Sequence, residues 1–200
     1  VDQVLEAIVK RIPAPKGDLD KPLEALIFDS FYDSYRGVIP LVRIMNGIIR
    51  KGMEIKMMAT EAKYEVIDVG VYLPKEVSKD YLSSGDVGWI SASIKDIEKI
   101  HVGDTITDAK NPTEKALPGY RLLTPMVYSG VYPVDADDYT DLKDSIEKMK
   151  LSDASLIYEP ETSNALGFGF RVGFLGMLHM EIFQERLERE FNQNLITTAP

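Results

Sequence analysis

The segment Val38-Ile39-Pro40-Leu41-Val42-Arg43-Ile44-Met45-Asn46-Gly47-Ile48-Ile49-Arg50 places two β-rich runs on either side of Asn46-Gly47. Both residues of an Asn-Gly pair tolerate positive φ, so the dipeptide predicts a β-hairpin. With these two, the region has six short β-rich runs separated by turn residues: Leu23–Asp29, Val38–Asn46, Ile48–Met58, Lys63–Leu73, Val87–Ile94 and Asp104–Thr107. Many short strands at close spacing predict a small antiparallel β-barrel over residues 23–110, whose closure removes open sheet edges. Residues 74–83 are interpreted as a short helical or irregular excursion.

The residues before the barrel predict a helix and a linker. Residues 1–12 carry one apolar face at helical spacing, formed by Val1, Val4, Leu5, Ile8, Val9 and Ile12. Pro13 ends the helix, and residues 13–22 are a linker by composition. A helix this short is marginal in water, so its apolar face is expected to pack on a domain outside this sequence. The first residue is not methionine, and we interpret the chain as a piece of a longer protein.

The second half of the chain changes rhythm after a further linker over residues 111–121. A strand is expected at Pro125–Tyr132, and then a helix with Asp137 as its N-cap. The remaining expected elements are strands Ser155–Glu159 and Phe168–Phe174, a helix over Leu175–Phe191 and a closing strand at Leu195–Thr198. The order β-α-β-β-α-β predicts a ferredoxin-like α+β sandwich over residues 122–200.

Composition excludes several kinds of site. The 200 residues are 44% hydrophobic and 28% charged, as in an ordinary globular protein. There is no cysteine, so disulfides, thiolate metal sites and a cysteine nucleophile are excluded. His101 and His179 are the only histidines, too few for a histidine-rich metal site. The aspartates Asp135, Asp137, Asp138 and Asp141 lack the spacing of a calcium loop and fit the start of a helix better.

One segment is basic although the formal net charge of the chain is −9. Between residues 36 and 56 there is a single acid, Glu54, beside five basic residues: Arg36, Arg43, Arg50, Lys51 and Lys56. These five are candidates for phosphate contacts with RNA. The alternative is a solvated sheet face whose balancing acids lie elsewhere in space.

The nucleotide chemistry of a GTPase is not visible in these residues. There is no G-x-x-x-x-G-K-[ST] loop and no Asn-Lys-x-Asp run, so we expect no GTP binding, no catalytic residue and no metal site. Gly167, Gly169, Gly173 and Gly176 alternate with bulky residues and are interpreted as positions where a strand bends into a helix. His179 cannot share a metal ion with Glu181, because residues two apart on a helix point apart. It is interpreted as a structural histidine with one hydrogen bond, or as a contact to a partner.

Several longer motifs resemble one family. They are Ala25–Val38, Met57–Thr60, Val102–Ile106, Pro133–Tyr139, Ala165–Ile182 and Asn194–Pro200. The most specific is Gly173-Phe174-Leu175-Gly176-Met177-Leu178-His179-Met180-Glu181. Together they resemble the elongation factor 4 (LepA) family of translational GTPases, along essentially the whole chain.

The resemblance implies a fold and a role. Residues 1–12 would be the last helix of the GTPase domain, 23–110 the β-barrel domain II and 122–200 domain III. The implied partners are the ribosome, through small-subunit ribosomal RNA and protein, and the protein's own GTPase and C-terminal domains, with no small-molecule substrate here. GTP and Mg are implied only for the full-length protein, in back-translocation or translation fidelity. Arg171 and His179 become candidate domain-interface or ribosome contacts in domain III. The family is cytoplasmic and is also found peripherally at the cytoplasmic face of the cell membrane.

Two other interpretations stay open. The chain could be part of another translational GTPase, of the elongation factor G or BipA type, or a stand-alone RNA- or protein-interaction module. The Gly173–Glu181 run favours elongation factor 4 over both elongation factor G and BipA.

Overall fold

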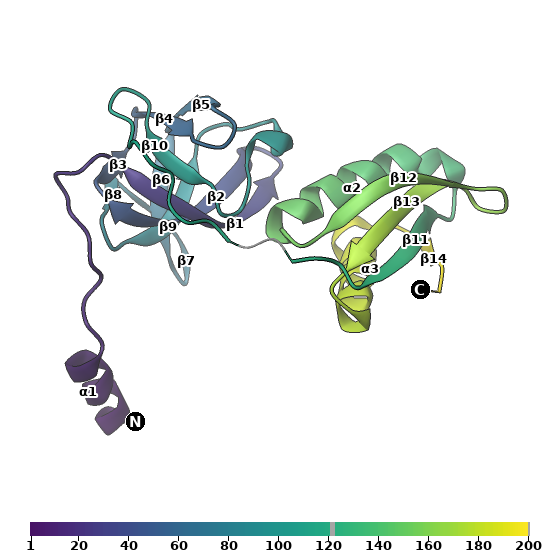
Figure 1. Ribbon diagram of the computed structural model, residues 1–200, viewed down its shortest axis with the longest axis horizontal. Coiled ribbons are helices and arrows are strands. Elements are labelled where there is room, and N and C mark those ends of the chain that lie inside the picture. Colours follow the sequence, from purple (N-terminus) through teal and green to yellow (C-terminus); the bar gives the residue numbers. More distant parts are fainter. Residues whose placement is uncertain (121–122, 200) are drawn as a thin grey trace. The chain divides into compact units, whose positions relative to one another are not determined.

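The computed structural model describes residues 1–120 and 123–199, and its contacts divide the chain into two compact units (Figure 1). The first unit comprises residues 1–28 and 33–119, and the second comprises residues 29–32 and 120–200. Each unit has buried apolar side chains of its own.

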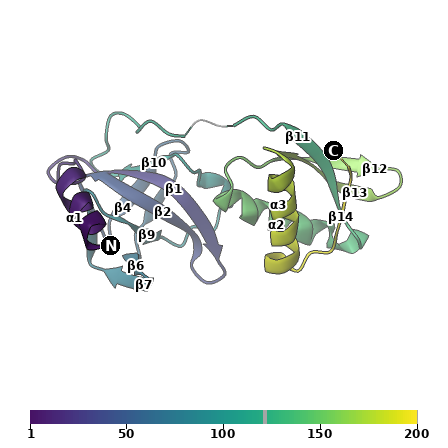
Figure 2. The same cartoon turned by 90° about the horizontal axis from the view of Figure 1, so that it is seen from below.

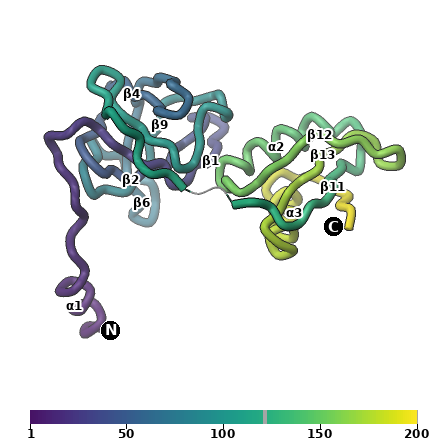
Figure 3. The backbone as a smooth tube through the Cα atoms, in the orientation of Figure 1, coloured from purple at the N-terminus to yellow at the C-terminus, as the bar shows by residue number. Residues whose placement is uncertain are grey.

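The chain begins with helix α1, Asp2–Arg11, which buries none of its side chains. Lys10 pairs with Glu6 one turn earlier at 3.0 Å, an exposed contact of small energetic weight. Residues 13–23 then run without helix or strand to the first strand, as the backbone trace shows (Figure 3).

The first unit is built from strands that form two antiparallel sheets. Their bounds are β1 Glu24–Asp33, β2 Gly37–Asn46, β3 Ile48–Arg50, β4 Glu54–Met57, β5 Lys63–Glu65, β6 Asp68–Leu73, β7 Lys75–Lys79, β8 Tyr81–Ser83, β9 Val87–Ser91 and β10 Thr105–Asp108, with a 3₁₀ turn at Ile97–Lys99. The large sheet has the order β5-β4-β10-β1-β2-β9-β6-β7, and β3 pairs with β8 in a small one. The strands curl around a core of fully buried aliphatic side chains such as Ile27, Ile44, Ile55 and Ile90. The predicted barrel-like fold is therefore confirmed.

Closure of this barrel differs from the expectation. β5 and β7 stand at the two ends of the strand order, and no ladder joins them in the part of the chain that the structure describes. β7 exposes all five of its residues, including Lys75 and Lys79. Charged side chains on an edge strand oppose pairing with another chain. The exposed lysines of β7 therefore protect this edge from aggregation although no strand covers it.

The predicted Asn46-Gly47 hairpin is wrong, because β2 does not pair with β3. Gly47 does have a positive φ of 72°, but its N–H donates to the Asp18 carbonyl. The Asn46 side chain accepts a hydrogen bond from the Asp18 N–H at 2.9 Å and donates to Glu24. The turn thus ties down the segment before β1 and sends the chain into the small sheet.

The interpretation of residues 74–83 is also wrong, because they form β7 and β8. In β7 both faces are exposed, so its sequence carries no alternation of buried and exposed positions. In β8 only Leu82 is buried. The runs Ile48–Met58 and Lys63–Leu73 each split into two strands.

The second unit has the predicted β-α-β-β-α-β order. Its elements are β11 Val127–Pro133, a 3₁₀ turn at Ala136–Asp138, α2 Tyr139–Ser152, β12 Ile157–Ser163, β13 Gly167–Phe174, α3 Met177–Phe191 and β14 Leu195–Thr197. The sheet order is β12-β13-β11-β14. Leu142 of α2 and Phe183 of α3 join Val131, Phe170 and Phe174 in one core, so both helices cover the same face of the sheet (Figure 2). This confirms the ferredoxin-like sandwich.

The capping residue of the first helix in this unit was mispredicted. Asp135, not Asp137, accepts a backbone hydrogen bond, from the Asp137 N–H, and it caps the 3₁₀ turn that leads into α2. Asp138 stands at the N-cap of α2 and makes no side-chain cap.

Glycines alternate with aromatic residues in β13 for a reason other than bending. Phe170 and Phe174 point into the core, whereas Gly169 and Gly173 lie on the opposite face of the strand. A Cβ at Gly169 would collide with the Tyr132 ring, and a Cβ at Gly173 would lie 2.9 Å from the Tyr128 ring. The register places Tyr128 opposite Gly173. These glycines therefore let two tyrosines of β11 lie flat on the sheet.

Candidate functional site

Arg36, the first of the basic candidates, is bound within the protein itself. It lies in the turn between β1 and β2, and its guanidinium donates to Asp33 and, at 2.7 and 3.0 Å, to Glu76. The guanidinium also lies over the Trp89 ring, 5.7 Å from its centroid. Arg36 therefore joins the first turn to β6–β7 and to β9.

The charges of this cluster are mutually stabilised. The hydrogen bonds that Arg36 donates to Glu76 and Asp33 raise the pKa of Arg36. The backbone amides of Arg36 and Tyr35, followed by the Arg36 side chain, lower the pKa of Asp33. The Arg36 hydrogen bond likewise lowers the pKa of Glu76. With two carboxylates in place, little of this cation is left for a phosphate.

Lys51 and Lys56 also have carboxylate partners. Lys51 Nζ lies 3.0 Å from Asp68 Oδ1 and donates to Ser78 Oγ at 2.9 Å. Lys56 Nζ lies 2.8 Å from Glu61 Oε1. For Arg36, Lys51 and Lys56, the balancing acids that the alternative interpretation required are therefore present.

Arg43 and Arg50 differ from the other three. Both side chains are exposed, and neither has an ion pair with any residue that the structure describes. Arg43 projects from β2 between the buried Val42 and Ile44, opposite Val87 of β9. These two arginines are the cations of the basic segment that remain available to a partner.

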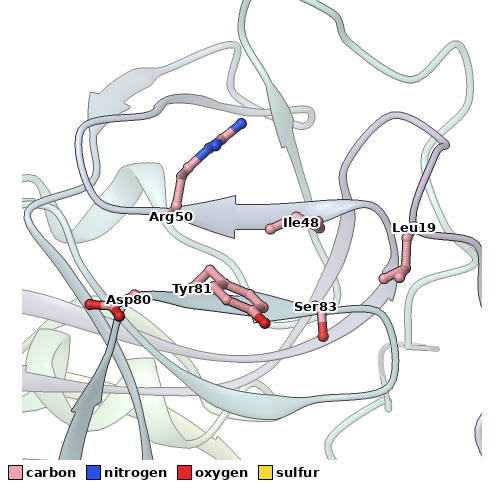
Figure 4. Close-up of a pocket in the computed structure, with 6 residues that line it drawn as sticks. All are labelled: Leu19, Ile48, Arg50, Asp80, Tyr81 and Ser83. Carbon is pink, nitrogen blue, oxygen red and sulfur yellow. The ribbon is translucent and has the colours of Figure 1, made fainter.

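Arg50 lines an open depression on the small sheet (Figure 4). The depression has a volume of about 470 Å³ and is lined by Leu19, Ile48, Arg50, Asp80, Tyr81 and Ser83. Arg50 and Asp80 lie at one end of it, Leu19 and Ser83 at the other, with Tyr81 and Ile48 between them (Figure 4). Sequence reasoning missed Tyr81 and Leu19, because no pattern revealed that β8 pairs with β3 and places Tyr81 opposite Arg50.

In the second unit, Arg171 lies on the face of the sheet that the helices leave uncovered. Its guanidinium lies 5.2 Å from the centroid of the Tyr128 ring, and it has no ion pair with the described residues. Glu159 is its register neighbour on β12. The side chain is exposed and free to meet a partner from this face.

His179 has a structural role. Its Nδ1 accepts a hydrogen bond from the Leu175 N–H at 3.0 Å, and its Nε2 lies 2.7 Å from Asp153 Oδ2. Because Nδ1 is an acceptor, the proton resides on Nε2 and is donated to the carboxylate. The ring packs edge-on against Phe174. His179 thus ties the start of α3 to the loop after α2 with two hydrogen bonds, one more than expected.

Two further kinds of feature are absent from the described ranges. Within residues 1–120 and 123–199, no group of three or more His, Asp or Glu side chains could hold a metal ion. No helix in these ranges is long and apolar enough to cross a membrane.

Comparison with known proteins adds three findings. Residues 37–107 match the family described as "Elongation factor Tu domain 2". Curated proteins named "Elongation factor 4" match all 200 residues, with 60% identity in Alkaliphilus oremlandii and in Clostridioides difficile and 58% in Bacillus licheniformis. The chain spans 33% of the length of each of these relatives.

A solved structure shows the same fold at low sequence identity. It is a crystal structure of a protein from Thermus thermophilus, with a TM-score of 0.75 and 21% identity, over 99% of this chain and 29% of that one.

Proposed function

Because the chain is homologous over its whole length to one third of elongation factor 4, we propose that it is the ribosome-contacting, non-catalytic part of a translational GTPase. The observation that carries the proposal is the 60% identity over all 200 residues. GTP hydrolysis, with GTP and Mg, would belong to a part of the protein outside this sequence. The protein would act on ribosomes in the cytoplasm, at a step such as back-translocation or fidelity control.

Within the chain, the first unit would contact small-subunit ribosomal RNA through Arg43 and Arg50. Both arginines are exposed on strands and have no carboxylate partner among the described residues. Each phosphate that they neutralise would release counterions and make binding weaken with salt. Arg171 of the second unit is a further candidate contact, held by Tyr128 with its charge unpaired among the residues that the structure describes.

Co-sedimentation with small ribosomal subunits over a salt series tests this function. The double variant Arg43→Glu and Arg50→Glu should bind at least about tenfold more weakly at low salt, with a shallower salt dependence. Arg36 is left intact, because its loss would break a structural cluster.

The control variant makes the same change in charge elsewhere. Lys143→Glu and Arg189→Glu alter exposed helix positions whose cations already have carboxylate neighbours. It should bind as the unchanged protein does. Equal binding by all three proteins would remove the assignment of Arg43 and Arg50, and no binding by the unchanged chain at low salt would contradict the proposed function.

A further inference from the structure

We propose that the depression lined by Leu19, Tyr81 and Arg50 is a pocket for one unpaired nucleotide of RNA. The inference rests on the proposed function and deepens it, because it assigns Arg50 a defined ligand rather than general attraction to RNA. The depression has a volume of about 470 Å³, which is in the range of small-molecule sites.

The floor of the pocket is preformed. β3 and β8 pair in the register Ile48↔Ser83, Ile49↔Leu82 and Arg50↔Tyr81. Ile49 and Leu82 are buried beneath, so the alternate residues of both strands must face outward into the depression. A rigid floor lowers the conformational cost of binding.

The end of the depression where Leu19 lies is also fixed by hydrogen bonds. The Gly47 N–H donates to the Asp18 carbonyl at 2.7 Å, and the Ser84 N–H donates to the Gly47 carbonyl. Asp86 Oδ2 accepts from both the N–H and the hydroxyl of Ser83. Leu19, next to Asp18, is therefore held at one end of the depression (Figure 4).

The chemistry of the lining fits a planar base with a phosphate. Tyr81 is 56% exposed and offers a ring on which a base can stack, and Leu19 and Ile48 supply apolar contact. Arg50, unpaired within the described residues and directly opposite Tyr81, can bind the phosphate.

Asp80 gives the pocket a preference for RNA. Its exposed carboxylate lines the pocket at the same end as Arg50, and no described residue hydrogen-bonds to it. A carboxylate repels a second phosphate but accepts a hydrogen bond from a ribose 2′-hydroxyl. Arg50 and Asp80 together therefore favour a ligand with a single phosphate and a ribose beside it. An apolar protein side chain could fill the same space, but it would make no use of Arg50.

NMR titration of the ¹⁵N-labelled chain with AMP, dAMP and adenosine tests the proposal, with the hexamer of adenylate as a tighter probe. Shift changes should concentrate on the amides of residues 48–50 and 80–83. AMP should bind more tightly than both dAMP and adenosine. No localised change with AMP or the hexamer would overturn the proposal, as would equal affinity for AMP and adenosine.

Variants separate the contribution of each group. Tyr81→Ala should weaken the binding of AMP and of adenosine alike by about fivefold or more, whereas Tyr81→Phe should leave both affinities unchanged. Arg50→Gln should weaken the binding of AMP by about tenfold and leave the affinity for adenosine unchanged. Lys143→Gln, at an exposed position of α2 outside the pocket, is the control and should change the affinity for neither ligand. Equal affinity for Tyr81→Ala and the unchanged chain would overturn the stacking assignment.

Co-sedimentation with small ribosomal subunits distinguishes failure of this inference from failure of the proposed function. If the chain binds subunits and Tyr81→Ala binds equally well, with no AMP shifts, the pocket is wrong and the function stands. Localised AMP binding without any subunit binding would retain the pocket and reject the function. Subunit binding that Tyr81→Ala loses while AMP causes no shifts would identify a protein occupant and overturn the nucleotide.

Discussion

At the scale of single residues, Asp104 is the one charged side chain that is buried among the residues that the structure describes. It is 7% exposed, and its Oδ1 accepts hydrogen bonds from the Ala59 and Thr105 amides at 2.9 and 2.7 Å. Its buried Oδ2 has no partner among the described residues. Burial raises the pKa of Asp104, and the two backbone hydrogen bonds only partly oppose that effect. The ionised carboxylate is therefore held at a cost to stability.

Because only the ionised form of Asp104 carries this cost, the free energy of unfolding depends on pH, and the sign of the dependence can be derived. Between the ordinary pKa of 3.8 and the raised one, the folded protein binds more protons at Asp104 than the unfolded chain does. The contribution of Asp104 to the free energy of unfolding therefore falls as pH rises through the folded pKa. Asp104→Asn, whose amide oxygen can keep both backbone bonds, should be more stable than the unchanged chain at neutral pH. Its advantage should disappear below about pH 4.

Urea unfolding at several pH values measures the difference. Glu61→Gln, at an exposed carboxylate whose pKa is lowered by its hydrogen bond with Lys56, is the control and should gain no stability at neutral pH. If Asp104→Asn were less stable than the unchanged chain at neutral pH, the ionised carboxylate would be contributing stability and our account would be wrong.

Residue-level partners could not be predicted from the sequence. The sequence singled out five basic residues, but it could not show that Asp68 and Glu76 lie beside Lys51 and Arg36, since those carboxylates come from other strands. Only the folded register separates the paired cations from Arg43 and Arg50. The proposal of RNA contacts for these two residues stays a prediction.

At the scale of elements, the glycine–tyrosine packing of β11 and β13 can be tested by one methyl group. A Cβ at Gly169 would collide with the Tyr132 ring and lie 2.5 Å from the Val131 carbonyl oxygen. Because a backbone atom cannot move aside easily, Gly169→Ala should lower the free energy of unfolding by about 2 kcal/mol or more. Denaturant unfolding gives the value.

Gly176 provides the matched control. A Cβ there would meet nothing within 4 Å, and its φ of 170° is extended backbone that any residue adopts. Gly176→Ala should therefore change stability by less than about 0.5 kcal/mol. Similar stabilities for the two variants would show that the tyrosines adjust and that Gly169 is not required.

Periodicity predicted the elements that bury one face and failed for those that do not. The α2 and α3 helices have apolar residues at helical spacing, and in β13 apolar residues alternate with glycine and arginine; all three elements were predicted. β7 exposes both faces, and β8 has three residues with one buried, so neither left a pattern. The pocket was not predicted either, because β8 forms part of its floor.

At the scale of the whole molecule, we predict that the chain neither binds nor hydrolyses GTP. Its 200 residues contain no phosphate loop with the required lysine and no guanine-reading run. Titration with a fluorescent GTP analogue should show no saturable binding at micromolar concentrations, and a phosphate-release assay should give a signal at the level of a protein blank. Saturable micromolar binding by the purified chain would contradict this prediction and point to a site of another kind.

Trp89, which lies beneath Arg36, also offers a built-in optical reporter. It is the sole tryptophan of the chain, and at 3% exposed it is enclosed in the first unit. A guanidinium lies over the indole in the native state, so unfolding exchanges that neighbour for water and should shift the emission to longer wavelength. Tryptophan emission therefore follows the barrel alone, whereas far-ultraviolet circular dichroism, to which α2 and α3 contribute, follows both units. Denaturation curves that do not superimpose would resolve the stability of each unit without cutting the chain.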